Sequence, residues 1–78
     1  MKFVYVLQSA DGEHYYVGVT DDVLDRLARH KAGDVTHTAK YLPWKIRVSV
    51  AFSDEARAFA FERYLKSGSG RAFAKKHF

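Results

Sequence analysis

Apolar residues near the N-terminus form two short runs separated by a polar turn. The first run, from Lys2 to Ser9, reads KFVYVLQS, and the second, from His14 to Thr20, reads HYYVGVT. Valine, tyrosine and phenylalanine at this density are typical of strands. The segment between the runs, ADGE at positions 10–13, supplies turn-forming residues. We therefore expect the two strands to pair as an antiparallel hairpin.

After the second run the spacing of apolar residues changes to a helical period. The side-chain oxygens of Thr20-Asp21-Asp22 suit a helix N-cap, and Gly33 stands where a C-terminal cap glycine belongs. A helix is therefore predicted from about Asp22 to Ala32. At about 100° per residue, its apolar arc has four members: Val23, Leu24, Leu27 and Ala28.

The remaining sequence alternates between irregular and periodic segments. Asp34 to Trp44 has no clear period and contains the only proline, so we expect a loop. Lys45 to Phe52 alternates as a third strand. Its apolar face is predicted to carry Ile46, Val48 and Val50, and its polar face Arg47 and Ser49.

The C-terminal third predicts helices. Ser53-Asp54 is suited to cap a helix that runs to about Lys66. Ser67 to Gly70 is expected to break that helix, and Arg71 to Phe78 to form a short further one. The order strand, strand, helix, strand, helix predicts an α+β fold, a small three-stranded and at least partly antiparallel sheet flanked by helices. At this length we expect residues 1–78 to form a single domain.

Composition narrows the classes of function. The chain has no cysteine, so a disulfide framework and a thiolate metal site are excluded, and a cytoplasmic location is expected. No apolar run approaches the roughly 20 residues of a membrane span, and the first residues do not form a signal peptide, so no membrane association is expected. Thirteen lysines and arginines against nine acidic residues give a net charge of +4. The bases gather in residues 26–47 and 63–76, which suits either a polyanion partner or an ordinary solvated surface.

A few residues stand in positions that packing alone does not explain. Glu62 falls inside the apolar arc of the second helix, so it must pair with Lys66, reach solvent, be protonated, bind a cation or face a cleft. Arg26 and His30 lie together at one edge of the first helix's arc, where each alone has an ordinary structural role as its alternative.

The two strands of the hairpin carry further candidates. Tyr5 and Tyr16 are ordinary packing residues when taken singly. Gly18 weakens a strand unless a backbone or ligand must come close at that position.

The order of these residues along the chain is more specific than any one of them. Tyr5, then Tyr16-Val17-Gly18, then Arg26 and His30, then Glu62 resembles the GIY-YIG nuclease family. The likeness is greatest to its small stand-alone bacterial members, which are similar to the GIY-YIG nuclease domain of the bacterial excinuclease. Family-like segments include VYVLQS, YYVGVTDDVLDRLARHKAG, KYLPWK and ERYLKSGSGRAF, so the resemblance covers nearly the whole chain.

The chain departs from the family pattern at three points. The first name-giving triplet stands as Phe3-Val4-Tyr5, which keeps only the tyrosine, and the second has valine in place of isoleucine. The chain contains no asparagine, although some relatives place one at the catalytic site. His37 is a loosely aligned counterpart of a second histidine found in homing-type relatives.

The resemblance implies a divalent-metal-dependent endonuclease that hydrolyses phosphodiester bonds, with DNA as the expected substrate. In that scheme Glu62 is the ligand of Mg²⁺ or Mn²⁺, and Arg26 neutralises the scissile phosphate. Tyr5 or Tyr16 is the base, provided that nearby cations lower its pKa, and His30 orients a tyrosine or relays its proton. Such an enzyme would serve DNA repair, recombination or uptake.

Other residues are expected to hold the nucleic acid by charge, stacking or close backbone approach. These are Gly18, Lys40, Tyr41, Trp44, Lys45, Arg47 and Lys66. For Trp44, packing as a loop anchor on the core is the alternative to base stacking. The alternative for the whole chain is a nucleic-acid-binding module that keeps the fold without useful catalysis, followed by a purely structural interaction domain. The oligomeric state stays open, with a monomer consistent with the sequence.

Overall fold

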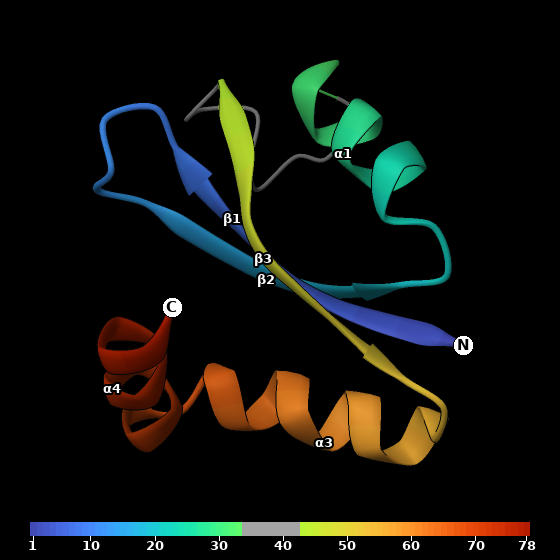
Figure 1. The fold of residues 1–78 in the computed structure, drawn as a ribbon. Coiled ribbons are helices and arrows are strands. Elements are labelled where there is room, and N and C mark those ends of the chain that lie inside the picture. Colours follow the sequence, from blue (N-terminus) through green and yellow to red (C-terminus); the bar gives the residue numbers. More distant parts are fainter. Residues whose placement is uncertain (34–42) are drawn as a thin grey trace.

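In a computed structural model, which describes residues 1–33 and 43–78, a three-stranded antiparallel sheet has the strand order β2-β1-β3. The strands are β1 (Lys2–Ser9), β2 (Tyr15–Thr20) and β3 (Trp44–Phe52), and the helices are α1 (Val23–Lys31), α3 (Glu55–Leu65) and α4 (Gly68–His77). Helix α1 covers one face of the sheet, and α3 and α4 cover the other (Figure 1). The predicted α+β fold is confirmed. In the described part of the chain, no helix is long and apolar enough to span a membrane.

The hairpin of β1 and β2 closes as the turn residues predict. Gly12 adopts a φ of +76°, a backbone conformation that glycine takes without steric cost. Ser9 Oγ donates to the Asp11 carboxylate at 2.5 Å and accepts from the backbone N–H of His14 at 3.1 Å. These bonds set the register in which Tyr5 lies opposite Gly18 and Leu7 opposite Tyr16.

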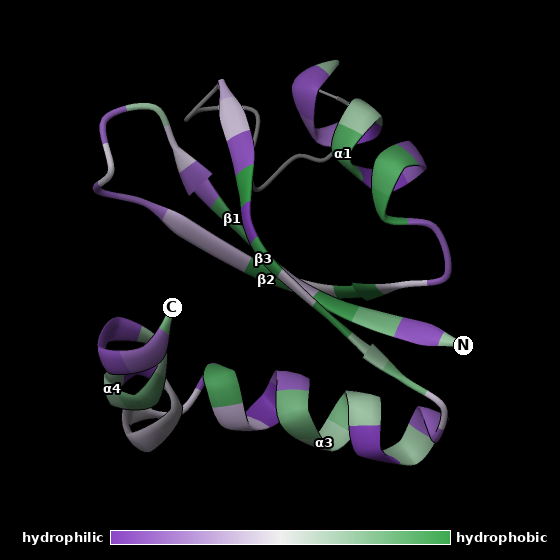
Figure 2. Ribbon diagram, viewed as in Figure 1, coloured by the Kyte–Doolittle hydropathy of each residue, from purple (hydrophilic) through white to green (hydrophobic). Residues whose placement is uncertain are grey.

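Strand β1 is central, so its side chains alternate between two separate cores. Val4 and Val6 pack with Ala58 and Leu65 beneath α3 and α4. Tyr5 and Leu7 pack with Trp44 on the α1 face, and all three are buried. Figure 2 shows the same arrangement as hydrophobic segments in the strands and as alternating hydrophobic and hydrophilic positions along α3. Burial on both faces explains why VYVL is a continuous apolar run.

The predicted single apolar face of the third strand is wrong, because β3 contains a bulge. Val48 pairs with Val6 and Ile46 with Leu7, which leaves Arg47 as the extra residue between them. Ile46 therefore packs with Tyr5 and Leu7 on the α1 face, whereas Val48 packs with Val4 and Val6 on the opposite face. The strict alternation of the sequence conceals this switch.

Helix α4 begins three residues earlier than predicted, at Gly68 instead of Arg71. Ser67 is its N-cap, and the Ser67 Oγ accepts from the N–H of Gly70 at 3.1 Å. A Cβ at Gly70 would lie 1.7 Å from the carbonyl oxygen of Tyr64, so the glycine lets α4 start directly against the end of α3. The segment that composition predicts as a break is thus a tight helix–helix junction.

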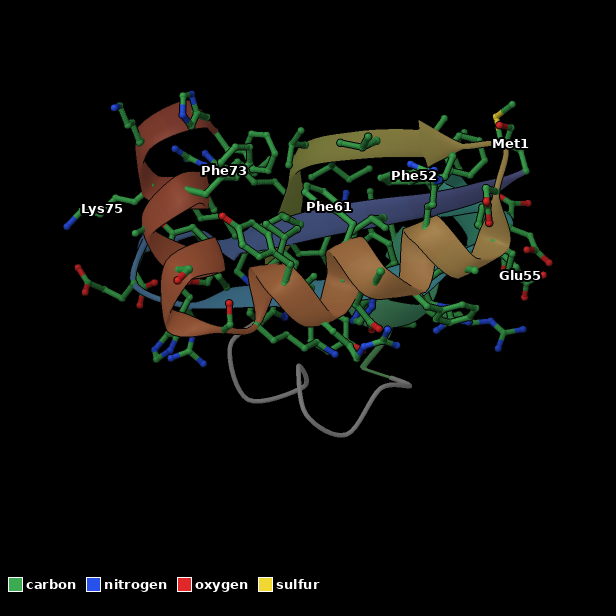
Figure 3. The ribbon with its side chains drawn as sticks, turned by 90° about the horizontal axis from the view of Figure 1, so that it is seen from below. Met1, Phe52, Glu55, Phe61, Phe73 and Lys75 are labelled. Carbon is green, nitrogen blue, oxygen red and sulfur yellow. The ribbon has the colours of Figure 1, made fainter. Side chains whose placement is uncertain are left out.

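An aromatic cluster holds the two C-terminal helices on the sheet. Phe52, Phe61 and Phe73 come from β3, α3 and α4 respectively (Figure 3). The ring centroids of Phe52 and Phe61 are 5.5 Å apart, and those of Phe61 and Phe73 are 6.3 Å apart. Rings at these separations contribute packing energy beyond the area they bury.

The junction generates a paired prediction on stability. Gly70→Ala should lower the free energy of unfolding by at least about 2 kcal/mol, because a backbone carbonyl cannot yield to the new methyl group. Gly68→Ala is the matched control, since among the described residues no atom lies within 4 Å of its added Cβ. That control should be neutral or stabilising by about 0.5–1 kcal/mol. Urea unfolding measures both, and equal effects would contradict the close approach.

Candidate active site

Helix α1 faces the sheet with two residues of the predicted apolar arc and with two residues that the arc did not include. Its inward residues are Val23, Arg26, Leu27 and His30, spaced at i, i+3, i+4 and i+7. Leu24, expected on the buried side, is 76% exposed. The placement of Arg26 and His30 at the edge of the buried arc is therefore wrong: both belong to the inward face.

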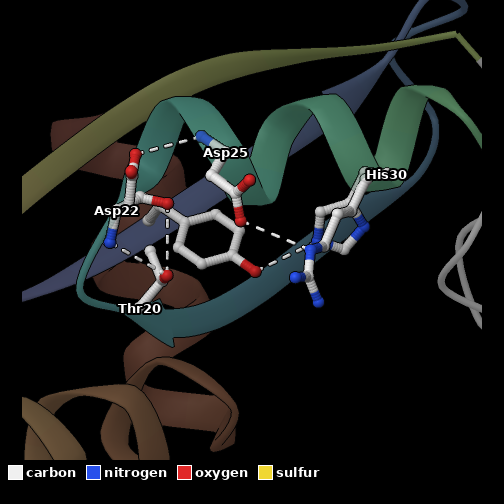
Figure 4. A network of polar contacts seen from close by, with 6 residues as sticks. Thr20, Asp22, Asp25 and His30 are labelled. Carbon is white, nitrogen blue, oxygen red and sulfur yellow. Dashed lines mark hydrogen bonds and ion pairs between the residues drawn. The ribbon is translucent and has the colours of Figure 1, made fainter.

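The start of α1 is held by two capping residues. The Asp22 carboxylate accepts from the backbone N–H of Asp25 at 3.0 Å, as an N-cap does (Figure 4). Thr20 Oγ1 also accepts from the N–H of Asp22 at 3.1 Å, which ties the end of β2 to the cap. Sequence analysis recognised the cap but did not identify Thr20 as a residue that positions the site; a hydroxyl two residues before a cap is the available signal.

Tyr5, Tyr16 and His30 meet on this face of the sheet. Tyr5 Oη lies 3.0 Å from His30 Nε2, a buried hydrogen bond between residues 25 positions apart (Figure 4). The Tyr16 and His30 ring centroids are 4.7 Å apart, and those of Tyr5 and Tyr16 are 6.2 Å apart. Tyr5 and His30 are buried, whereas Tyr16 is half-buried on the edge strand β2. Three elements thus contribute to one cluster.

Gly18 leaves the space that the Tyr5 side chain occupies. A Cβ at Gly18 would lie 2.5 Å from Tyr5 Oη and 2.7 Å from its Cζ, closer than real Cβ contacts come. The glycine itself is buried. The approach that requires a glycine here is that of a tyrosine ring, and the structure supplies no exposed backbone at Gly18 for a nucleic-acid contact.

Burial and charge set the protonation of the cluster at neutral pH. Burial, with a smaller contribution from Tyr16, raises the pKa of Tyr5 to about 12, although the guanidinium of Arg26 acts to lower it. Burial and, secondarily, the positive charge of Arg26 lower the pKa of His30 below its ordinary value of 6.5. At pH 7 the cluster therefore holds a protonated Tyr5 beside a neutral His30. The condition for Tyr5 as the base, that nearby cations lower its pKa, is not met in this state, because burial outweighs Arg26.

Glu62 comes from the opposite side of the sheet. It belongs to the inward face of α3, together with Ala58, Phe61 and Leu65, and its side chain is 20% exposed. Its Oε2 accepts from Lys66 Nζ at 3.0 Å, which is the pairing that the sequence suggested as an alternative. Helix α3 also contacts the edge strand β2, which carries Tyr16 on its other face. Glu62 and the tyrosine cluster thus belong to opposite faces of the sheet.

The chemistry of Glu62 fits a hard divalent cation. In residues 1–33 and 43–78, no group of three or more histidine or acidic residues could hold a metal ion. Mg²⁺ does not require such a group, because one carboxylate with waters and substrate phosphate oxygens completes its coordination. A half-buried carboxylate whose partner is an exposed lysine meets that requirement.

The residues predicted to contact nucleic acid differ in their burial and their partners. Trp44 is only 3% exposed and packs with Tyr5 and Leu7, so the structure supports the packing alternative and corrects the expectation of base stacking. Lys45 and Lys66 are exposed. Arg47 lies on the face opposite the cluster, where it donates to Gln8 Oε1 at 2.9 Å. Lys40 and Tyr41, like His37, lie outside the described residues.

The contact between Tyr5 and Gly18 predicts an energetic coupling. Gly18→Ala should lower the free energy of unfolding by about 1–3 kcal/mol, because the methyl group overlaps the Tyr5 ring. In a Tyr5→Leu background the same change should cost clearly less, since the ring is gone. Urea unfolding of the four proteins forms a double-mutant cycle. Equal costs in the two backgrounds would show that the ring is not what excludes a side chain at position 18.

Burial of neutral His30 predicts a pH dependence of stability. Its folded-state pKa lies below 6.5, so above pH 6.5 both folded and unfolded states are neutral and its contribution is fully present. As the pH falls through 6.5, the unfolded state binds a proton that the folded state resists, and stability is lost until the folded pKa is passed. Urea midpoints at pH 7.5 and 5.0 should therefore differ more in the parent than in His30→Gln. An equal difference in both proteins would contradict the assignment.

Comparison with known proteins shows which family the chain belongs to. Residues 1–76 match the family described as the GIY-YIG catalytic domain. The chain is 42% identical over 65 residues to a UPF0213 protein of Lacticaseibacillus paracasei, covering 82% of this chain and 72% of that protein. A UPF0213 protein of Halobacterium salinarum is 37% identical over 67 residues, covering 85% and 86% respectively. The solution NMR structure of a UPF0213 protein from Bacillus halodurans is 30% identical, with a TM-score of 0.58 over 96% of this chain and 81% of that one. The chain therefore belongs to the GIY-YIG family.

Proposed function

We propose that this chain is a divalent-metal-dependent endonuclease that hydrolyses phosphodiester bonds in DNA. The observation that carries the proposal is the meeting of Tyr5, Tyr16 and His30, with the Arg26 guanidinium acting on two of them. These residues come from two strands and a helix, and they are the ones that the family resemblance identifies. A packing role alone would not require a buried histidine, an arginine and two phenols at one point of a sheet face.

The cluster supplies two of the requirements of phosphoryl transfer. Arg26 provides a planar cation for the equatorial oxygens of the scissile phosphate, whose charge must be neutralised in the transition state. Neutral His30 has the protonation state of a proton acceptor. It lies next to Tyr16, the cluster phenol that is only half-buried and therefore nearest to solvent.

The two tyrosines take different roles in this scheme. Tyr5 keeps its proton at neutral pH, because its pKa is about 12, and its hydroxyl orients His30. Tyr16 is the phenol that would contact the attacking water. His30 would receive the proton in the tautomer whose Nε2–H donates to Tyr5 Oη, so that its other ring nitrogen is the acceptor. The base is thus the pair of Tyr16 and His30, with Tyr5 as the residue that positions the imidazole.

Glu62 would hold the divalent cation on the α3 face of the sheet. A bound Mg²⁺ or Mn²⁺ supplies charge neutralisation for the phosphate and the departing oxygen. Lys66, which pairs with Glu62 in this structure, would contact the phosphate backbone once the carboxylate holds the cation. Because Glu62 and the cluster lie on opposite faces, a substrate that contacts both would have to pass around the edge strand β2.

Substitution of Glu62 tests the proposal. Glu62→Ala should reduce cleavage of DNA in Mg²⁺ or Mn²⁺ by at least about 100-fold, because the cation loses its only protein ligand in this scheme. Binding of DNA, measured by fluorescence anisotropy, should persist. The assay uses single-stranded, duplex and branched DNA and RNA, each with and without metal.

Glu55→Ala is the matched control, since it removes an exposed carboxylate from the first turn of the same helix. This control should cleave as the parent does. Full activity of Glu62→Ala would refute the assigned metal ligand. Salt-sensitive DNA binding without cleavage in any metal by the parent would favour a binding module that keeps the fold without catalysis.

A further inference from the structure

A groove of about 590 Å³ lies on the face of the sheet opposite the tyrosine cluster. It is bounded by the β1–β2 hairpin on one side and by α4 on the other, which lie at the same end of the molecule (Figure 1). Its apolar floor consists of Val6, Val17, Leu65 and Ala74. Tyr15 stands on its rim with 55% of its surface exposed. The size is in the range of small-molecule sites.

Three cations line this groove, whereas Glu13 is its one acidic residue. Arg47 is held in place: its guanidinium donates to Gln8 Oε1 at 2.9 Å and to the backbone carbonyl of Phe78. Its Cζ lies 6.0 Å from the centroid of the Tyr15 ring. The other two, Arg71 and Lys75, are exposed on α4, and neither forms a salt bridge with any residue that the structure describes. The groove thus combines an ordered cation with two available ones.

We propose that this groove binds one nucleotide, with its phosphate on Arg71 and Lys75 and its base on the apolar floor beside Tyr15. The charge of three cations and one acid suits a ligand that carries a phosphate better than a ligand that carries only one carboxylate. A flat aromatic body fits a floor of valine, leucine and alanine with a half-exposed phenol at its edge. The choice of a nucleotide over another aromatic phosphate rests on the proposed function; the cationic groove does not.

A free nucleotide and a nucleotide within a strand present the same chemistry to this groove. In a strand, the groove would anchor a nucleotide remote from the scissile bond, since Glu62 and the tyrosine cluster are not among its lining residues. Sequence analysis described the bases of residues 63–76 as suited to a polyanion partner or a solvated surface, and it assigned a specific contact only to Lys66. Only the fold reveals that α4 turns two of them toward the hairpin.

The test is an NMR titration of the ¹⁵N-labelled chain with dAMP, with a short single-stranded DNA, with inorganic phosphate and with decanoate. We expect dAMP to shift the amides of Tyr15, Val17 and Lys75. Arg71→Glu with Lys75→Glu should weaken dAMP binding by about tenfold or more, because two charge-assisted contacts are lost. Lys76→Glu is the matched control: an exposed lysine on the same turn of α4 that does not line the groove. If the double variant is unfolded by circular dichroism, Lys75→Gln takes its place.

Each arm decides the proposal. Shifts at the groove with dAMP alone, or with dAMP and the DNA, support it and identify whether the source is free or within a strand; shifts with the DNA alone support the strand. Equal loss in Lys76→Glu, or phosphate or decanoate binding as tight as dAMP, overturns it. Cleavage of DNA by the parent without groove shifts rejects the groove and keeps the nuclease. If dAMP shifts the groove amides but the parent cleaves no nucleic acid, the groove proposal is kept and the nuclease proposal is rejected.

Discussion

The approach of the Tyr5 ring to Gly18 is the contact on which the site depends. It occurs because the hairpin register places these residues directly opposite each other on neighbouring strands. A phenol that crosses above its partner strand needs a residue without a side chain there, and only then does its hydroxyl lie 3.0 Å from His30. The hairpin turn, the register and the helix cap all serve this one arrangement. A slip of one residue would send Tyr5 to the other face.

The strands and the family were predictable because they depend on local composition and on the order of a few residues. The orientation of α1 was not. Hydrophobicity favours Leu24 over His30 for the buried side, but His30 is satisfied by a hydroxyl 25 residues away. A helical period contains no information about such a distant partner. An apolar arc therefore misplaces polar residues that are buried because they form a hydrogen bond with a residue distant in the sequence.

Glu62 illustrates the opposite case. Its position among apolar neighbours was visible in the helical period, and the structure places it on the inward face of α3. The helical period could not show which face of the sheet α3 would cover. In the structure α3 packs on one face and α1 on the other. The two halves of the candidate site therefore come from opposite faces of the sheet. Long-range topology, not local preference, decides this arrangement.

The bulge at Arg47 changes which face of the sheet the even-numbered residues of β3 occupy. Before it, even-numbered residues such as Trp44 and Ile46 belong to the α1 layer; after it, Val48 and Phe52 belong to the layer of α3 and α4. One inserted residue thus lets a strand with an unbroken alternating pattern furnish anchors for both cores. We therefore expect β3 to tolerate apolar substitutions better than the deletion of a residue. If one residue were removed at the bulge, the side chains of the N-terminal half of β3 would point to the opposite face of the sheet. Trp44 and Ile46 would then no longer pack beneath Tyr5.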